Sequence, residues 1–242
     1  MATSSPPKSN SFPITKWTLV RQARGEATSD AWTDIFKSYW YPLYAYVRRR
    51  GYNMHDAEDL TQGFFYELIS KDCLASADRE RGRLRAFLLA MLKNHLASEW
   101  KRSQAAKRGG GQQIVSLNVA MAEEKIDASD SSKELSPEDD FDRKWAITLF
   151  QDALAELQRD IEERHGKKMF TELRHYLIHQ ADRVDYKKLQ EAVGIVDSNM
   201  RIMVHRQRKA LRRSLRARVA ETLMDEADVE DEFRYVMMLL SR

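Results

Sequence analysis

The sequence is poor in the residues that build disulfide-stabilised and strand-and-turn proteins. Its 242 residues include one cysteine, Cys73, nine glycines and five prolines. A single cysteine cannot form an internal disulfide, and no second thiol stands at metal-binding spacing, which is typical of a reducing compartment. So few glycines and prolines argue against a fold with many tight turns. We therefore expect an all-α protein without disulfides.

Long apolar runs are also missing. The longest apolar segment extends from Ala86 to Leu92, which is far short of the roughly 20 residues needed to cross a bilayer. The first residues, MATSSPPKSNSFP, are polar and contain no apolar export segment. These features predict a cytoplasmic protein with no membrane association and a disordered leader over residues 1–11.

Charge is abundant but segregated along the chain. The net charge is only +3, yet residues 79–108 hold nine Lys/Arg against two Asp/Glu, and residues 198–220 hold eight against none. Residues 121–142 show the reverse, two against nine. Basic blocks of this kind are typical of surfaces that bind a polyanion, and the acidic block can solvate or screen them.

Helical spacing of apolar residues predicts a first domain over residues 12–107. Trp32, Ile35, Phe36, Tyr39 and Trp40 recur at helical intervals. The helix then breaks, and a second one restarts at YPLYAYVRRRG, with Pro42 in its first turn and Gly51 as its C-cap. Further apolar stripes begin at Leu60 and Leu84.

A flexible acidic linker is predicted over residues 108–140. AAKRGGGQQ breaks the helix, and EEKIDASDSSKELSPEDD has too few apolar residues to offset the entropy of ordering. Order resumes where Ser136 can cap a helix and Pro137 can occupy its first turn. A second helical domain follows over 141–222, and a C-terminal helical extension, 223–242, is expected to pack back on it.

The segment DAEDLTQGFFYEL contains several Asp and Glu residues and no basic residue. If its apolar residues face the core, Asp56, Glu58, Asp59 and Gln62 fall in the first turns and on the exposed side. Carboxylates repel phosphates, so this surface is unsuited to nucleic acid. Its natural partner is a basic protein surface.

The second domain contains a helix-turn-helix pattern, DYKKLQEAVGIVDSNMRIMVHRQRKALRRSL. A short helix ends near Gly194, Asp197 or Ser198 can cap the next helix, and that helix carries a basic face. A cationic helix fits the major groove of B-form DNA, where Arg reads guanine edges and Lys neutralises phosphates. In the first domain, Lys and Arg residues alternate with Asn94 and Trp100. Asn and Trp are residue types that hold unstacked nucleotide bases.

Three segments together resemble bacterial RNA polymerase sigma factors of the extracytoplasmic-function (ECF) group. YWYPLYAYVRRRGYNMHDAEDLTQGFFYEL resembles the core helices with their D-A-x-D-L-x-Q-x-x-F pattern. RAFLLAMLKNHLASEWKR resembles the promoter-melting helix, and LQEAVGIVDSNMRIMVHRQRKALRRSL resembles the C-terminal helix-turn-helix. The likeness spans roughly residues 12–218, in the same order.

The resemblance implies a role for each surface. Asp56, Glu58, Asp59 and Gln62 would contact the clamp of the largest catalytic subunit of core RNA polymerase. Promoter DNA would be bound at two elements. The −10 contacts would be Arg79, Arg81, Arg83, Arg85, Asn94, Trp100, Lys101 and Arg102. The −35 contacts would be Ser198, Asn199, Arg201, His205, Arg206, Arg208 and Lys209.

Two positions depart from the family pattern. Thr61 stands where many relatives have a hydrophobic residue, and Gly63 stands where they have an acid. The KRGGG segment, the long linker and the extension resemble a subgroup in which some members are controlled by serine/threonine kinases. Phosphorylation of Thr61 would add about −1.5 to −2 charge to the docking face and replace the missing acid. The resemblance also implies an anti-sigma factor as a candidate partner.

Two other functions compete with the sigma-factor interpretation. The helix-turn-helix could belong to an ordinary DNA-binding regulator that never replaces a polymerase subunit. Alternatively, His175 and His179 in HYLIH stand one helical turn apart, a spacing that can chelate a metal in a nucleic-acid hydrolase. That pair lacks the glutamate of H-E-x-x-H and a third ligand. We expect no enzyme activity, no cofactor and no metal.

Overall fold

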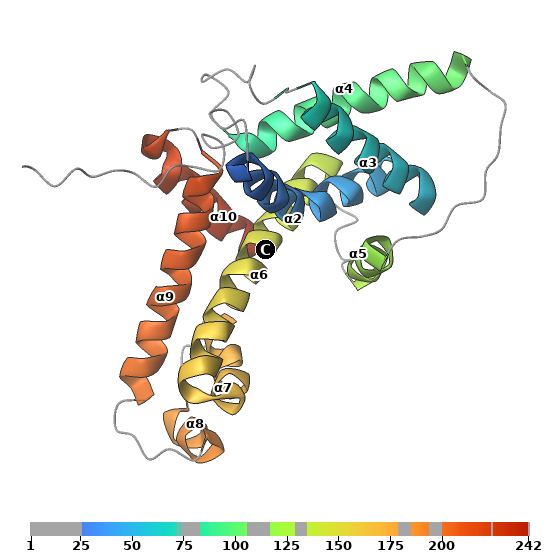
Figure 1. The fold of residues 1–242 in the computed structure, drawn as a ribbon. Coiled ribbons are helices and arrows are strands. Elements are labelled where there is room, and N and C mark those ends of the chain that lie inside the picture. Colours follow the sequence, from blue (N-terminus) through green and yellow to red (C-terminus); the bar gives the residue numbers. More distant parts are fainter. Residues whose placement is uncertain are drawn as a thin grey trace, which may run out of the picture.

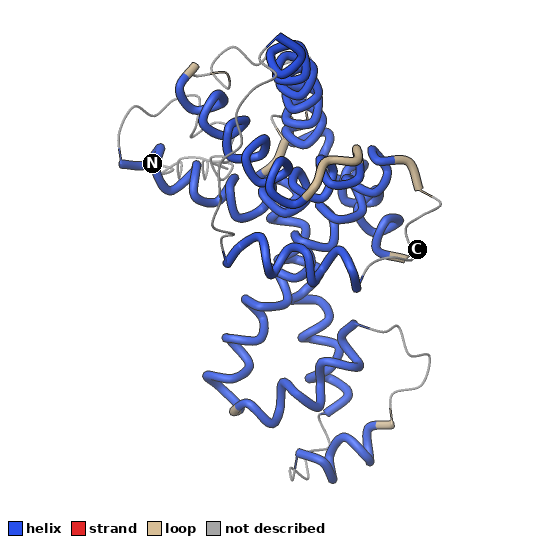
Figure 2. The backbone as a smooth tube through the Cα atoms, turned by 90° about the vertical axis from the view of Figure 1, so that its right-hand side faces the viewer, coloured by secondary structure: helices blue, strands red, loops and turns tan. Residues whose placement is uncertain are grey.

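The computed structural model describes residues 26–71, 73, 83–105, 117–128, 135–178, 185–193, 200–223 and 225–241. Within these ranges every regular element is a helix, and the one β-bridge joins Arg83 to Leu223. The prediction of an all-α protein is confirmed, and Figure 2 shows helices throughout. No helix in the described ranges has the length and apolar character needed to cross a membrane.

Helix α2 spans Glu26–Arg49 without interruption. The break predicted before Pro42 is therefore wrong, because the helix continues through this proline, which is buried. Proline in a helix removes one backbone hydrogen bond, but the nearby aromatic residues Trp40 and Tyr44 are buried in the core. Gly51 ends the helix as predicted, with φ of 93° in the left-handed region that favours glycine.

Helices α3 (Met54–Ser70) and α4 (Leu84–Ala105) pack against α2 and against each other. The start of α3 is fixed by Asn53, whose side chain accepts a hydrogen bond from the backbone N–H of Asp56 at 2.9 Å. This is an ordinary N-cap, which satisfies a free donor of the first turn. It holds the acidic segment at the beginning of α3.

A further helix, α5 (Leu117–Ala128), lies within the segment predicted to be a flexible linker. That prediction is wrong for residues 117–128, because Val119 and Ala122 supply a short apolar stripe that is fully buried. In Figure 1, α5 lies beneath α2 and α3, and it packs against both. Residues 137–140, the end of the predicted linker, are also helical, and residues 108–116 and 129–134 lie outside the described residues.

Helix α6 (Pro137–His165) is the longest element. Ser136 caps it as predicted, accepting a hydrogen bond from the N–H of Asp139, and the acidic first turn suits the positive end of the helix dipole. Helix α7 (Lys167–Ile178) follows directly after Gly166.

The helix-turn-helix pattern folds as α8 (Tyr186–Val193) and α9 (Met200–Glu221), both of which pack against α7. Figure 1 shows α9 running alongside α6, with α7 and α8 at the end remote from α2, α3 and α4. A 3-10 turn, η3 (Glu226–Asp228), leads into α10 (Val229–Leu240). As expected, α10 packs on α6 and α9.

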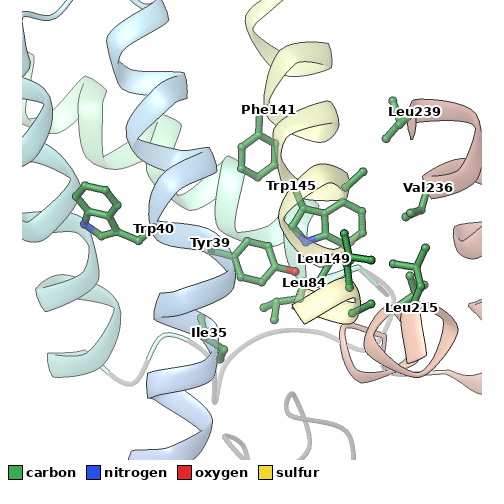
Figure 3. Packing of buried hydrophobic residues seen from close by; sticks show 14 of the residues in the cluster. Ile35, Tyr39, Trp40, Leu84, Phe141, Trp145, Leu149, Leu215, Val236 and Leu239 are labelled. Carbon is green, nitrogen blue, oxygen red and sulfur yellow. The ribbon is translucent and has the colours of Figure 1, made fainter. Parts of the chain in front are cut away.

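The buried residues of all these helices form one continuous cluster. Trp145 of α6 is fully buried at its centre, between Tyr39 of α2 and the α10 residues Val236 and Leu239 (Figure 3). The α2–α6 contact is the most extensive in the molecule's described part. Residues assigned to separate domains from the sequence thus share one core at this end of α6.

Candidate nucleic-acid and partner interfaces

The first candidate interface is an acidic ridge on α3. Asp56, Asp59 and Gln62 are exposed, as predicted, and recur at helical spacing on the outside of the helix. The ridge carries negative charge and no base, so a basic protein surface complements it. We keep the name acidic ridge for these three residues.

Two other residues predicted for this face are not exposed. Glu58 is only 6% exposed and accepts a hydrogen bond from Gln62, and Thr61 is fully buried. The hydroxyl of Thr61 donates to the carbonyl oxygen of Ala57 at 2.7 Å. Both predictions of exposure are wrong, because this flank of α3 faces other helices rather than solvent. A kinase cannot reach Thr61 while the helices are packed this way.

The second candidate interface was expected around the start of α4, but its two described arginines, Arg83 and Arg85, are paired within the molecule. Arg85 is 7% exposed and donates to Glu232 and Asp142, each at 2.6 Å. Its guanidinium also lies 4.7 Å from the ring centroid of Tyr235. Arg85 therefore joins α4 to α6 and α10 and is not the DNA contact that was predicted.

The charge of Arg85 is strongly stabilised despite its burial. Desolvation opposes the charged form, but the hydrogen bonds and charges of Glu232 and Asp142 outweigh it and raise the pKa of Arg85. Arg83 is exposed and forms an ion pair with the same Glu232 at 3.1 Å. Glu232 is 1% exposed, so these two arginines, rather than water, are the partners of its carboxylate.

The rest of α4 does present the predicted residues to solvent. Asn94, Lys101 and Arg102 are exposed, and Trp100 is 57% exposed. Arg102 makes an exposed ion pair with Glu99 at 2.5 Å, a contact that adds little stability and is easily exchanged for another anion. An exposed indole beside cationic side chains is suited to stacking on an unpaired base.

The third candidate interface lies on α9 and is basic. Arg201, His205, Arg206 and Lys209 are exposed as predicted. The exposed stripe continues along the helix at intervals of four and three residues through Arg213 and Arg216, which the sequence-based set of contacts did not include. We call these six residues the α9 basic surface. Arg216 also donates to Glu230 of α10 at 2.6 Å, in an exposed ion pair.

Arg208 is turned away from this surface. Its Nε and a terminal nitrogen both donate to the carbonyl oxygen of Tyr176, at 2.9 and 2.8 Å, near the end of α7. Free carbonyls at a helix C-terminus need donors, and a guanidinium there also suits the helix dipole. Arg208 therefore ties α9 to α7, and its prediction as a base contact is wrong in this arrangement.

One buried polar pair between α3 and α4 was not anticipated from the sequence. His95 is 9% exposed, and its Nδ1 lies 2.6 Å from Oε2 of Glu67. Hydrogen bonds from Lys71 and then from His95 lower the pKa of Glu67. The other ring nitrogen of His95 lies next to Gly63 and is buried without a hydrogen-bond partner in the described part of the chain. No sequence signal separates His95 from a surface histidine.

The histidine pair considered for metal chelation is not assembled as a site in the part of the chain that is described. His175 is exposed on α7, and His179 lies outside the described residues. No three His, Cys, Asp or Glu side chains converge there in a metal-binding arrangement. Arg79, Arg81, Ser198 and Asn199, predicted DNA contacts, also lie outside the described residues.

The geometry therefore offers an acidic ridge on α3, an exposed mixed surface on α4 and a basic surface on α9. A scan against protein-family models found no matching model, and searches of curated proteins and of solved structures found no match. A function for the chain therefore has to be argued from these surfaces.

Proposed function

We propose that this protein is an alternative sigma factor, a dissociable subunit that directs bacterial core RNA polymerase to specific promoters and assists strand opening. The observation that carries the proposal is that one chain exposes surfaces of opposite charge on separate helices. The acidic ridge on α3 suits a basic protein, and the α9 basic surface suits paired DNA. The resemblance of three sequence segments to the ECF group supports the same assignment.

Each surface has one role in this proposal. Asp56, Asp59 and Gln62 contact the clamp of the largest polymerase subunit. Asn94, Trp100, Lys101 and Arg102 on α4 hold unpaired bases of the −10 element, while α8 and α9 bind the −35 element. In this division residues 12–107 serve polymerase and the −10 element, and residues 141–222 serve the −35 element. Phosphorylation of Thr61 has no role in this proposal, because that side chain is buried.

Run-off transcription with purified core RNA polymerase tests the proposal. The protein should support specific initiation that core enzyme alone does not give. Initiation should be lost when Asp56 and Asp59 are both changed to Lys, because the ridge then repels a basic partner. Equal charge changes at Glu163 and Asp231, exposed acids on α6 and α10, should leave initiation intact and serve as the control.

Other outcomes identify the competing functions. Specific DNA binding without initiation from core enzyme would indicate a helix-turn-helix regulator that does not act as a polymerase subunit. Metal-dependent cleavage of the template would indicate a hydrolase. Either result would overturn the sigma-factor proposal.

A further inference from the structure

Helix α5 is a short helix seated on the side of α2 and α3. It contacts both helices, and in Figure 1 it lies apart from α6, α9 and α10. Val119 and Ala122 are buried against its neighbours, whereas Met121 is 53% exposed and Glu124 and Lys125 are exposed. Among its described side chains, α5 thus buries a narrow stripe and exposes Met121 and Glu124.

One ion pair fixes the position of α5. Nε of Arg48 donates to Oε1 of Glu123 at 2.6 Å, and a terminal nitrogen of Arg48 donates to Oε2 at 2.9 Å. The hydroxyl of Tyr44 donates to the same carboxylate at 2.5 Å. Bidentate pairing of this kind is both strong and directional. The hydrogen bonds from Arg48 lower the pKa of Glu123, which keeps the carboxylate charged.

The same arginine also reaches the beginning of α3. Arg48 donates to the carbonyl oxygen of Tyr52 at 2.7 Å, in the turn that leads to the N-cap Asn53. Glu58 of α3 lies near enough to Tyr44 for its charge to contribute to the raised pKa of that phenol, after burial and Glu123. The anchor of α5 and the buried flank of α3 are therefore neighbours.

The contact is small enough to be reversible. Among the α5 side chains that the structure describes, Val119 and Ala122 are fully buried and Ile126 is partly buried. Its polar contacts there are the pairing of Glu123 with Arg48 and Tyr44 and the position of Lys125 over the ring of Tyr41, 5.1 Å from its centroid. Segments with few buried apolar contacts are the ones that open locally while the rest of a protein stays folded. Release of α5 would uncover Tyr44, Arg48 and the flank of α3 that carries Glu58, directly beside the acidic ridge.

We propose that α5 is a self-docked regulatory helix that covers one flank of α3 and restricts the access of a protein partner to the acidic ridge. The inference rests on the proposed function, in which α3 binds core polymerase. Its structural basis is the pairing of Arg48 with Glu123, because that pair joins the covering helix to both α2 and the turn before α3. Partner binding and α5 docking then compete, so loosening α5 increases the affinity for the partner.

Hydrogen–deuterium exchange of the full-length protein tests the docking. Glu123→Lys should place two cations together and accelerate exchange of the α5 amides at least tenfold, and Arg48→Glu should do the same with two acids. The charge swap that combines Arg48→Glu with Glu123→Arg should restore slow exchange. Glu124→Lys, an exposed change one residue further along α5, is the matched control and should leave exchange unchanged. Equal exchange in all five proteins would overturn the proposal.

Binding to core RNA polymerase tests the restriction of access. Glu123→Lys should bind at least threefold more tightly than the natural sequence, whereas Glu124→Lys should not differ. Faster amide exchange in α5 without tighter binding to core RNA polymerase would show that α5 does not restrict access to the acidic ridge. This result would overturn the regulatory role. Failure of every variant, and of the natural sequence, to bind core polymerase would overturn the proposed function and this role with it, while the exchange result would still report the docking itself.

Discussion

The arginines of this protein differ in what surrounds their guanidinium groups. Arg85 lies buried among two carboxylates and aromatic rings, and Arg208 caps a helix end. Arg201 and Arg206 are exposed on α9. Only the exposed arginines can exchange their water for phosphate at low cost, because a buried pair must first be broken. We therefore expect changes of buried arginines to lower the free energy of unfolding, and changes of exposed arginines to weaken binding without lowering it.

Changing Arg85 to Met should destabilise the protein by about 3–5 kcal/mol, because the buried side chain of Glu232 loses its main partner. The free energy of unfolding in urea measures this loss. Arg83→Met is the control, since Arg83 is exposed, and it should cost less than about 1 kcal/mol. Similar costs for the two variants would contradict the assignment of Arg85 to a buried network.

The pair of Arg48 and Glu123 should make stability depend on acid pH. The pKa of Glu123 is held below its ordinary value of 4.5 by hydrogen bonds from Arg48. A lowered carboxylate pKa stabilises the folded state above the unfolded value and loses this effect as pH falls through the folded value. The natural sequence should exceed Glu123→Gln in unfolding free energy by about 1 kcal/mol at pH 7. This difference should shrink as the pH falls below 4.5, and a constant difference down to about pH 3 would refute the pairing.

Helix α3 is weakened by a glycine that no turn requires. A methyl group at Gly63 would lie 3.6 Å from Nε2 of His95, an ordinary contact distance. Gly63→Ala should therefore stabilise the protein by about 0.5–1 kcal/mol, measured as the free energy of unfolding. Gly51→Ala should instead destabilise it by about 1 kcal/mol, because Gly51 has a positive φ. The opposite order would contradict the backbone geometry described for these two positions.

The α9 basic surface should carry the salt dependence of DNA binding. Replacing Lys209 and Arg213 with Ala should weaken binding to duplex DNA and reduce the slope of log affinity against log salt by about 0.9 for each phosphate that is no longer neutralised. Fluorescence anisotropy at several salt concentrations measures this slope. Arg208→Ala should leave the slope unchanged and lower thermal stability, since it removes the donors to the Tyr176 carbonyl.

Elements set by local signals could be predicted from the sequence, whereas those set by distant contacts could not. The start of α6 follows from Ser136 and Pro137, and Gly51 ends α2, because caps act within one turn. The continuity of α2 through Pro42 depends on packing around it. The apolar residues of α5 show only weak helical periodicity, and the helix forms where it packs against α2 and α3.

The same limit applies to the candidate interfaces. Exposure of Asp56, Asp59 and Gln62 follows from helical periodicity around an apolar stripe. The burial of Glu58 and Arg85 depends on helices far away in the sequence, notably α10 in the case of Arg85. Charge patterns in a sequence therefore predict which helices are basic, but not which of their charges are already paired within the fold.

The stability of the whole fold depends on Trp145, which is buried where α2, α6 and α10 meet. Trp145→Ala should cost about 3–5 kcal/mol in unfolding free energy, because a fully buried indole leaves a large cavity. Trp100→Ala is the matched control, since this indole is 57% exposed, and it should cost less than about 0.5 kcal/mol while weakening single-stranded DNA binding. Comparable losses for both would contradict the position of the core.

Helix α6 has 29 residues, a proline only in its first turn and no glycine, so it forms a stiff rod about 44 Å long. Its first half is embedded among the aromatic rings of α2, and its last turns reach toward α7 and α8. Because this stiff helix packs against α2, its last turns and α7 can move relative to α3 and α4 only if the contact between α2 and α6 is broken.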